Sequence, residues 1–246
     1  MIVKTDAFSY GRFTGKHFND DEILRLKSNL DYAFFVSWEP FNSDEISDQT
    51  EKKSACIEIE DNIENQIAKC NPTCRNEVRR SFTINDFKLE INSTPLEELF
   101  EFHKQCENER NWHPVPPDEL KSSTVVCMRY KEELISGMTA YTEKDFLRIG
   151  RIFTRRKSNK YENLQQVVFS CASRRLVIEM TNIARTMGYS VLDLGGVSLD
   201  DPTKAGITKF KLSFGSVIKD VFLARYYGSS YQNLIRYCEE NSFDLT

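Results

Sequence analysis

The sequence has few histidines, and its cysteines lack the spacing of a metal site or a disulfide framework. Its 246 residues include three histidines and seven cysteines, an odd number scattered along the chain. Cys70 and Cys74 form a close pair, but a structural zinc site would need a second such pair or a histidine pair beside it. We therefore expect free thiols and no metal site.

Long hydrophobic runs are also absent. The longest, such as Tyr32–Val36 and Val167–Phe169, are far too short to cross a bilayer. The first residues, Met1 to Asp6, lack the apolar core of a signal peptide. Since 40% of the residues are apolar and 28% are charged, the composition is that of an ordinary globular protein, and we expect a cytoplasmic location.

A general excess of basic charge is missing, but a local one is present. The net charge of −4 argues against a general nucleic-acid binder. Between Asp145 and Arg175, however, eight basic residues stand against two acidic ones: Arg148, Arg151, Arg155, Arg156, Lys157, Lys160, Arg174 and Arg175. This stripe indicates either a phosphate-bearing partner or a solvated helix face with adjoining strand ends.

Hydrophobic periodicity predicts a regular series of elements from residue 86 onward. A strand at 87–91 precedes a helix that starts at Pro95 and is broken by the prolines at 114, 116 and 117. Three strands follow at 124–130, 134–141 and 146–153, then a long helix at 163–187, a strand at 190–194, a short helix, a strand at 217–226 and a closing helix at 231–240. The long helix has one apolar stripe and should face a core.

The first 85 residues show a weaker pattern. It predicts a helix from Asn19 or Asp20, a strand at 32–36, a mobile loop at 42–54, a strand at 55–60 and a helix starting near Pro72.

The most informative stretch is Asp193-Leu-Gly-Gly-Val197, followed by Gly206-Ile-Thr-Lys-Phe-Lys-Leu-Ser-Phe-Gly215. It predicts a short buried strand, a glycine turn, a polar loop and a short helix that carries Lys211. Two adjacent glycines allow the backbone to approach a ligand closely or to adopt a positive φ. The Lys211 cation could bind a phosphate or a developing oxyanion, or it could be an ordinary surface lysine.

These motifs resemble the FemA/FemB/FemX-like branch of the GNAT acyltransferase superfamily. That branch has a "DLGG…GI..FK..FG" pattern after its central helix, and Arg75–Ser81 and Leu99–Arg110 resemble its "R..IRRA" helix and its acceptor-side helix. The resemblance implies an α/β (α+β) fold with a GNAT-like mixed, splayed β-sheet flanked by helices, which agrees with the predicted element order. Residues 86–246 would form the acyltransferase domain, and residues 1–85 a small N-terminal extension that could be a reduced GNAT-like half.

The resemblance also implies roles for particular residues. The catalytic candidates are Lys211, Asp193 and Glu109, with Glu107, His103 and His113 as further candidates for a base. The donor-binding candidates are Arg155, Arg156, Lys157, Lys160, Gly195 and Gly196, and the acceptor-binding candidates are Arg79, Arg80, Arg110 and Trp112. Each of these could instead be solvated, ion-paired or buried for structural reasons.

Glycine is missing from residues 155–163, between the fourth strand of the fold and the long helix. CoA-dependent GNAT enzymes usually hold the pyrophosphate on a glycine-bearing loop there. FemX-like proteins lack that loop and take their acyl group from aminoacyl-tRNA. We therefore expect no bound cofactor, and an acyl donor, aminoacyl-tRNA or acyl-CoA, that acts as co-substrate.

The function implied by the resemblance is acyl or aminoacyl transfer onto an amine. The acceptor would be a nucleotide- or lipid-linked amino sugar or a peptidoglycan precursor in cell-envelope glycan synthesis, and the tRNA acceptor end a further partner. One alternative is an acyl-CoA-dependent N-acyltransferase acting on another small amine. The other is a non-catalytic GNAT-fold module that binds tRNA or a partner protein.

Overall fold

The computed structural model of the chain describes residues 1–5, 8–156 and 166–245. Its ten strands form one open sheet in the order β1-β2-β3-β10-β4-β9-β8-β7-β6-β5. The strands are β1 (Ile2–Lys4), β2 (Ser9–Gly15), β3 (Tyr32–Ser37), β4 (Asp48–Glu58), β5 (Phe87–Ile91), β6 (Thr124–Tyr130), β7 (Glu133–Tyr141), β8 (Leu147–Thr154), β9 (Val191–Val197) and β10 (Val217–Tyr227). The sheet is mixed, because β2–β3 and β8–β9 are parallel neighbours and the other pairs are antiparallel.

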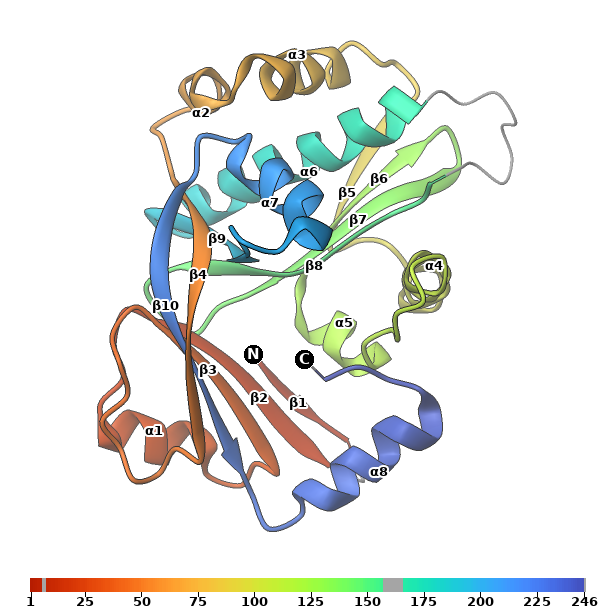
Figure 1. The fold of residues 1–246 in the computed structure, drawn as a ribbon. Helices are drawn as coiled ribbons and strands as arrows, with labels where there is room; N and C mark the ends of the chain where they lie inside the picture. Colours follow the sequence, from red (N-terminus) through yellow and green to blue (C-terminus); the bar gives the residue numbers. More distant parts are fainter. Residues whose placement is uncertain (6–7, 157–165, 246) are drawn as a thin grey trace.

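Helices cover this sheet in separate groups (Figure 1). They are α1 (Asp20–Lys27), α2 (Ile63–Lys69), α3 (Pro72–Ser81), α4 (Leu96–Asn108), α5 (Pro117–Ser122), α6 (Gln166–Thr186), α7 (Ala205–Leu212) and α8 (Tyr231–Asn241). Helix α6 packs across β6–β9 and is itself covered by α2 and α3, and this sandwich holds the largest apolar core. None of the described helices is long and apolar enough to cross a membrane.

The long helix behaves as its apolar stripe predicts. Phe169, Leu176 and Met180 are buried in the main core. The predicted start at residue 163 lies outside the described residues, and the helix ends at Thr186, just before Gly188, which has a φ of +81°. The prediction of a mixed sheet with this helix packed across it is confirmed.

The sheet splays between β8 and β9. Their pairing consists of Leu147 with Leu192 and Arg148 with Asp193, after which the two parallel strands diverge. This is the opening that the GNAT-like prediction places after the fourth strand of residues 86–246.

Strand β4 corrects one prediction. The segment 42–54 was expected to be a mobile loop, but residues from Asp48 onward belong to an 11-residue strand. Its polar first half pairs with the far end of β10, from Arg225 to Val221. The strand therefore exists because of a partner distant in sequence, and its exposed, charged residues give no local apolar alternation that would predict it.

The predicted boundary after residue 85 does not coincide with a break in the sheet. Strand β4 lies between β9 and β10, and β10 pairs with both β3 and β4. Each half of the sheet contains a parallel strand–helix–strand unit, β2-α1-β3 in one and β8-α6-β9 in the other. Helix α1 starts as expected, since Asn19 and Glu22 form a reciprocal cap.

The core assignment of α6 gives the first testable prediction. Replacing the fully buried Leu176 with alanine should lower the free energy of unfolding by about 2–5 kcal/mol, because the substitution leaves a cavity between helix and sheet. Met187 is 46% exposed just beyond the helix, and its replacement with alanine should change the free energy by less than about 0.5 kcal/mol. Urea denaturation measures both, and equal effects would contradict this packing.

Candidate active site

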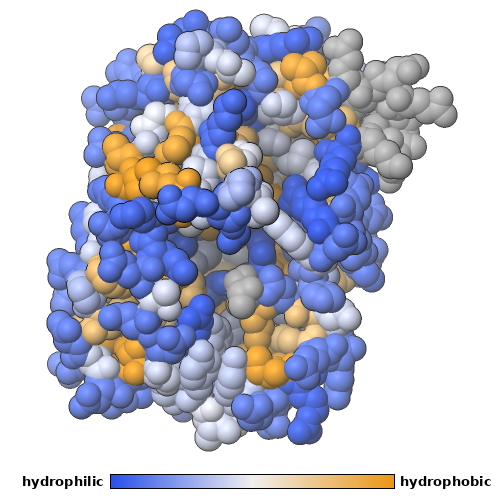
Figure 2. All heavy atoms as spheres, in the orientation of Figure 1, coloured by the Kyte–Doolittle hydropathy of each residue, from blue (hydrophilic) through white to orange (hydrophobic). Residues whose placement is uncertain are grey.

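A cavity of about 790 Å³ opens where β8 and β9 diverge. Residues 149–152 and 154 of β8 line one wall, and residues 194–196 of β9 line another. Helix α4, helix α7 and the β3–β10 part of the sheet close the remaining sides. Figure 2 shows the hollow near the middle of this face, between the upper and lower parts of the molecule.

A β-bulge shapes the β8 wall. Thr139 pairs with Arg151 and Ala140 pairs with Ile149, so Gly150 is an extra residue on β8. The residue added by a bulge is left out of the hydrogen-bond ladder. A Cβ atom at Gly150 would lie 2.9 Å from the Thr139 hydroxyl, so a larger residue would crowd this bend. The bulge thus presents glycine backbone to the cavity.

A buried ion pair closes the narrow end, where β8 and β9 last pair. The Asp193 carboxylate is fully buried and contacts the Arg148 guanidinium and the Ser54 hydroxyl. It also accepts a hydrogen bond of 2.7 Å from the Gly195 N–H, and Gly195 has a φ of +83° that suits glycine. Asp193 therefore fixes the glycine turn and Arg148 from behind the cavity wall.

Lys211 reaches this turn from α7. Its ammonium donates a hydrogen bond of 2.7 Å to the Gly196 carbonyl, and the side chain lines the cavity. Burial lowers the pKa of Lys211 to about 8; the nearby Arg148 adds to the shift and Asp193 opposes it. Phe214 is buried and contacts Phe210, which anchors the helix that carries the lysine.

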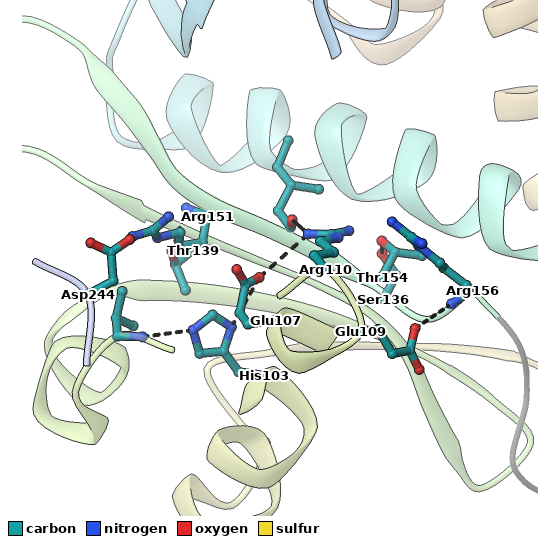
Figure 3. A network of polar contacts seen from close by, with 12 residues as sticks. His103, Glu107, Glu109, Arg110, Ser136, Thr139, Arg151, Thr154, Arg156 and Asp244 are labelled. Atoms are coloured by element: carbon teal, nitrogen blue, oxygen red, sulfur yellow. Dashed lines mark hydrogen bonds and ion pairs between the residues drawn. The ribbon is translucent and has the colours of Figure 1, made fainter. Parts of the chain in front are cut away.

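Helix α4 brings a buried carboxyl group to the opposite wall (Figure 3). Glu107 is 1% exposed and lines the cavity. Its Oε1 atom lies 3.5 Å from Arg110 Nη1, and its Oε2 atom has no hydrogen-bond partner among the described residues. Burial raises the pKa of Glu107, although Arg110 and Arg151 oppose the shift.

His103 lies one helical turn before Glu107 and is fully buried. Its Nε2 atom accepts a hydrogen bond of 3.1 Å from the Val115 N–H, so the neutral ring carries its proton on Nδ1. Nδ1 lies 3.9 Å from Glu107 Oε1. Burial, together with Arg151 and Arg110, lowers the pKa of His103 to about 3, so the ring is neutral at pH 7.

The described residues that line the cavity are strongly cationic. Glu107 is the single carboxylate among seven basic side chains: Arg12, Arg110, Arg148, Arg151, Arg156, Arg225 and Lys211. Such a lining favours a ligand that carries negative charge.

The structure brings six of the predicted site residues to this cavity: Lys211, Gly195, Gly196, Arg110, Trp112 and Arg156. Asp193 lies directly behind the wall. Lys157 and Lys160 lie outside the described residues.

Four other predicted residues do not line the cavity. The Glu109 carboxylate accepts a hydrogen bond of 3.2 Å from the Arg156 N–H, outside the lining. Arg155 donates to the Leu134 carbonyl at 3.0 Å. Arg79 and Arg80 are exposed on α3.

Sequence reasoning named Glu107 and His103 among the further candidates for a base, but it did not recognise the buried Glu107–His103 pair or the burial of Arg148. Both had a signal in the sequence. Arg148 stands between apolar Leu147 and Ile149 in a strand, and charged residues are seldom buried without a partner. Glu107 follows His103 by four residues, which places it on the same helix face.

Comparison with solved structures confirms the predicted fold. FemX superimposes with a TM-score of 0.58 at 10% identity, over 97% of this chain and 85% of that one. L-PGS from Bacillus licheniformis gives 0.55 at 13% identity, over 96% and 83% of the two chains. The C-terminal domain of a candidate lysylphosphatidylglycerol synthetase from Agrobacterium fabrum gives 0.54 at 13% identity, with the same coverage.

The chain has a FemX-like fold. No protein-family model matches the sequence, and no curated protein is detectably similar to it. At these low identities the likeness concerns the fold, a GNAT-like mixed α/β arrangement.

The position of Lys211 predicts a pH-dependent stability. Its pKa of about 8 in the folded chain lies below the usual value of about 10.4, so the unfolded state binds more protons between these pH values. The contribution of Lys211 to stability should therefore rise with pH from about 8 to about 10 and be constant below this range.

Lys211→Met keeps most of the unbranched side chain and removes its charge. Urea denaturation of both proteins at pH 7, 8.5 and 10 gives the difference in free energy of unfolding. Wild type should gain stability relative to the variant as the pH rises. A difference that does not change with pH would show that Lys211 is not desolvated.

Proposed function

We propose that this chain is an N-acyltransferase that moves an acyl or aminoacyl group from an activated carbonyl onto an amine. The observation that carries the proposal is the splayed β8–β9 opening, which has a glycine bulge on one wall and a buried, incompletely paired carboxyl group on the opposite wall. Acyl transfer to an amine needs a positioned carbonyl, a neutral amine and a stabilised oxyanion.

Glu107 is suited to accept the proton of the amine. Its carboxyl group is buried, lines the cavity and has an oxygen without a hydrogen-bond partner among the described residues. A raised pKa strengthens it as a base, and Arg110 keeps a compensating charge nearby. The neutral His103 limits the movement of the carboxyl group from one side. Glu109, two residues away, lies outside the lining, so we now assign the role of base to Glu107.

The transfer consists of an addition to the donor carbonyl and an elimination of the donor's leaving group. The amine nitrogen attacks the donor carbonyl carbon and forms a C–N bond, and the carbonyl oxygen becomes an oxyanion. Backbone of the Gly150 bulge and the Lys211 ammonium border the place where that charge would develop. The amine proton passes to Glu107. Collapse of the intermediate breaks the bond to the leaving oxygen or sulfur of the donor, which departs with the bonding electron pair and takes up a proton from Glu107 or solvent.

The finer assignment is that aminoacyl-tRNA is the donor and that the acceptor is a nucleotide- or lipid-linked amino sugar or a peptidoglycan precursor, used in the cytoplasm. It is supported by the predicted FemX-like motifs, the FemX-like fold and the cationic lining. Arg156, Gly195 and Gly196 would contact the donor, and Arg110 and Trp112 the acceptor. The parallel units β2-α1-β3 and β8-α6-β9 support the further proposal that residues 1–85 derive from a reduced GNAT-like half.

A donor panel tests the proposed function. Acetyl-CoA and a short aminoacyl-RNA analogue are each titrated into the protein while its thermal unfolding is followed, because a ligand that binds the folded state raises the midpoint. We expect the RNA analogue to stabilise the protein and acetyl-CoA to have little effect. Stabilisation by acetyl-CoA alone would favour a CoA-dependent transferase, and no response to either would indicate a non-catalytic module.

Glu107→Gln tests the mechanism once a donor is known. We expect kcat/KM to fall by about 10²–10⁴-fold and the acidic limb of its pH profile to disappear, since the amide cannot accept a proton. Glu109→Gln, at the C-terminal cap of the same helix but outside the lining, is the matched control and should remain close to wild type. Equal losses in the two variants, or full activity in Glu107→Gln, would remove Glu107 from the mechanism.

A further inference from the structure

The residues that follow α8 turn back toward the cavity. Ser242 has a φ of +53° and ends the helix, and the next N–H, that of Phe243, donates to the Cys238 carbonyl at 2.8 Å. The Phe243 ring contacts Tyr237 on α8 and Phe100 on α4, with centroid distances of 6.0 and 6.1 Å. We call Phe243–Leu245 the returning segment. In Figure 1 the chain leaves α8 and runs back past α5 toward the N-terminus.

Asp244 and Leu245 of the returning segment make polar contacts with Pro114, Arg151 and Arg12. The Asp244 N–H donates to the Pro114 carbonyl at 2.8 Å. The Asp244 carboxylate accepts from Arg151 Nη2 at 2.6 Å. The Leu245 carbonyl accepts from Arg12 Nη2 at 2.8 Å. Both arginines line the cavity, so this segment of the chain itself occupies groups that face the ligand space.

Arg151 lies beside the proposed chemistry. It follows the Gly150 bulge directly on β8. Its backbone N–H donates to the Thr139 hydroxyl at 3.0 Å, which fixes the position of the Arg151 backbone. Figure 3 shows the Asp244–Arg151 pair next to His103 and Glu107. A guanidinium recognises a carboxylate by charge and by its fork of N–H donors.

Arg12 has a second partner, a carboxylate, within the core. Arg12 is 6% exposed and pairs with the buried Glu119 at 3.2 Å, so its charge is already balanced within the core. Asp244, a carboxylate partner of Arg151, belongs to the returning segment, outside the core. Removing the segment would leave Arg12 paired with Glu119 and would take Asp244 away from Arg151.

We propose that Arg151 is a carboxylate-binding subsite of the cavity, and that Asp244 of the returning segment is its internal occupant, which a ligand carboxylate displaces. The assignment of this subsite to the acceptor rests on the proposed function: the acceptor would carry a carboxylate close to the amine that Glu107 deprotonates. An internal occupant reduces the apparent affinity of a ligand by the fraction of molecules whose subsite is open. A segment bound about nine-tenths of the time would weaken binding about tenfold.

The experiment uses N-acetylglycine as a carboxylate probe and N-acetylglycinamide as its neutral counterpart. Binding to the full chain is measured by calorimetric titration. Asp244→Asn should bind N-acetylglycine about tenfold more tightly than wild type, because the competing charge is gone. The gain should vanish in Asp244→Asn/Arg151→Gln, and the neutral probe should not distinguish the proteins. Asp220→Asn, which removes an exposed pair with Lys53 at 2.6 Å, is the matched control and should behave like wild type.

A second measurement uses wild type alone and does not depend on a folded variant. Saturating N-acetylglycine should accelerate hydrogen exchange of the Asp244 amide, which loses the Pro114 carbonyl as its acceptor when the segment leaves, and N-acetylglycinamide should not. The proposal is overturned if exchange is unchanged, if Asp244→Asn binds no more tightly than Asp220→Asn, or if the gain persists without Arg151. None of these measurements needs turnover. The subsite proposal can therefore be disproved while the proposed acyl transfer is retained, and the acyl transfer can be disproved while the subsite is retained.

Discussion

The Arg148–Asp193 ion pair is the contact on which the rest of the site depends. It joins β8 and β9 at the last position where their backbones pair, and the strands diverge beyond it. Continued pairing would fill the space that the cavity now occupies. Since Asp193 also holds the Gly195 N–H, one carboxylate fixes the narrow end of the opening and the glycine turn that Lys211 reaches. Burying such a pair is favourable only when its remaining hydrogen-bond capacity is satisfied, and Ser54 on β4 contributes to this.

Charge balance in the cavity follows from the same constraint. Basic side chains dominate the lining, and carboxylates from several elements offset them. Three of these carboxylates lie at or beside the proposed chemistry: Asp193 on β9, Glu107 on α4 and Asp244 after α8. Asp193 is inaccessible to a ligand. Glu107 is buried but faces the cavity, and Asp244 belongs to a segment that can leave. The three carboxylates thus have different roles. Asp193 is structural, Glu107 is proposed to accept a proton, and Asp244 is proposed to be displaced by a ligand.

Much of the fold could be predicted from residues 86–227, because most elements there carry their own apolar pattern and stop signal. The short helix α5, directly after the proline break, was not predicted. The glycine turn and Lys211 could be predicted to lie close together, because a short strand, a turn and a short helix that are adjacent in sequence can pack in few ways. Arg148 opposite Asp193 could not, because their contact depends on the register between two parallel strands joined by a long helix. Glu107 and Glu109 have the same chemistry, and only the orientation of α4 separates them. The polar half of β4 was mistaken for a loop because its partner, β10, lies at the other end of the chain.

The distance in sequence between β4 and β10 also has a consequence during protein synthesis. Strands β3 and β4 leave the ribosome long before β10, which pairs with both of them, so each presents an unpaired edge while the chain grows. Unpaired edges invite association with other chains, and charged residues discourage it. Asp48, Glu51, Lys52 and Lys53 lie on the part of β4 that later pairs with β10. The same charged residues that prevent the prediction of this strand from sequence would therefore also prevent association of its unpaired edge until β10 has been synthesised.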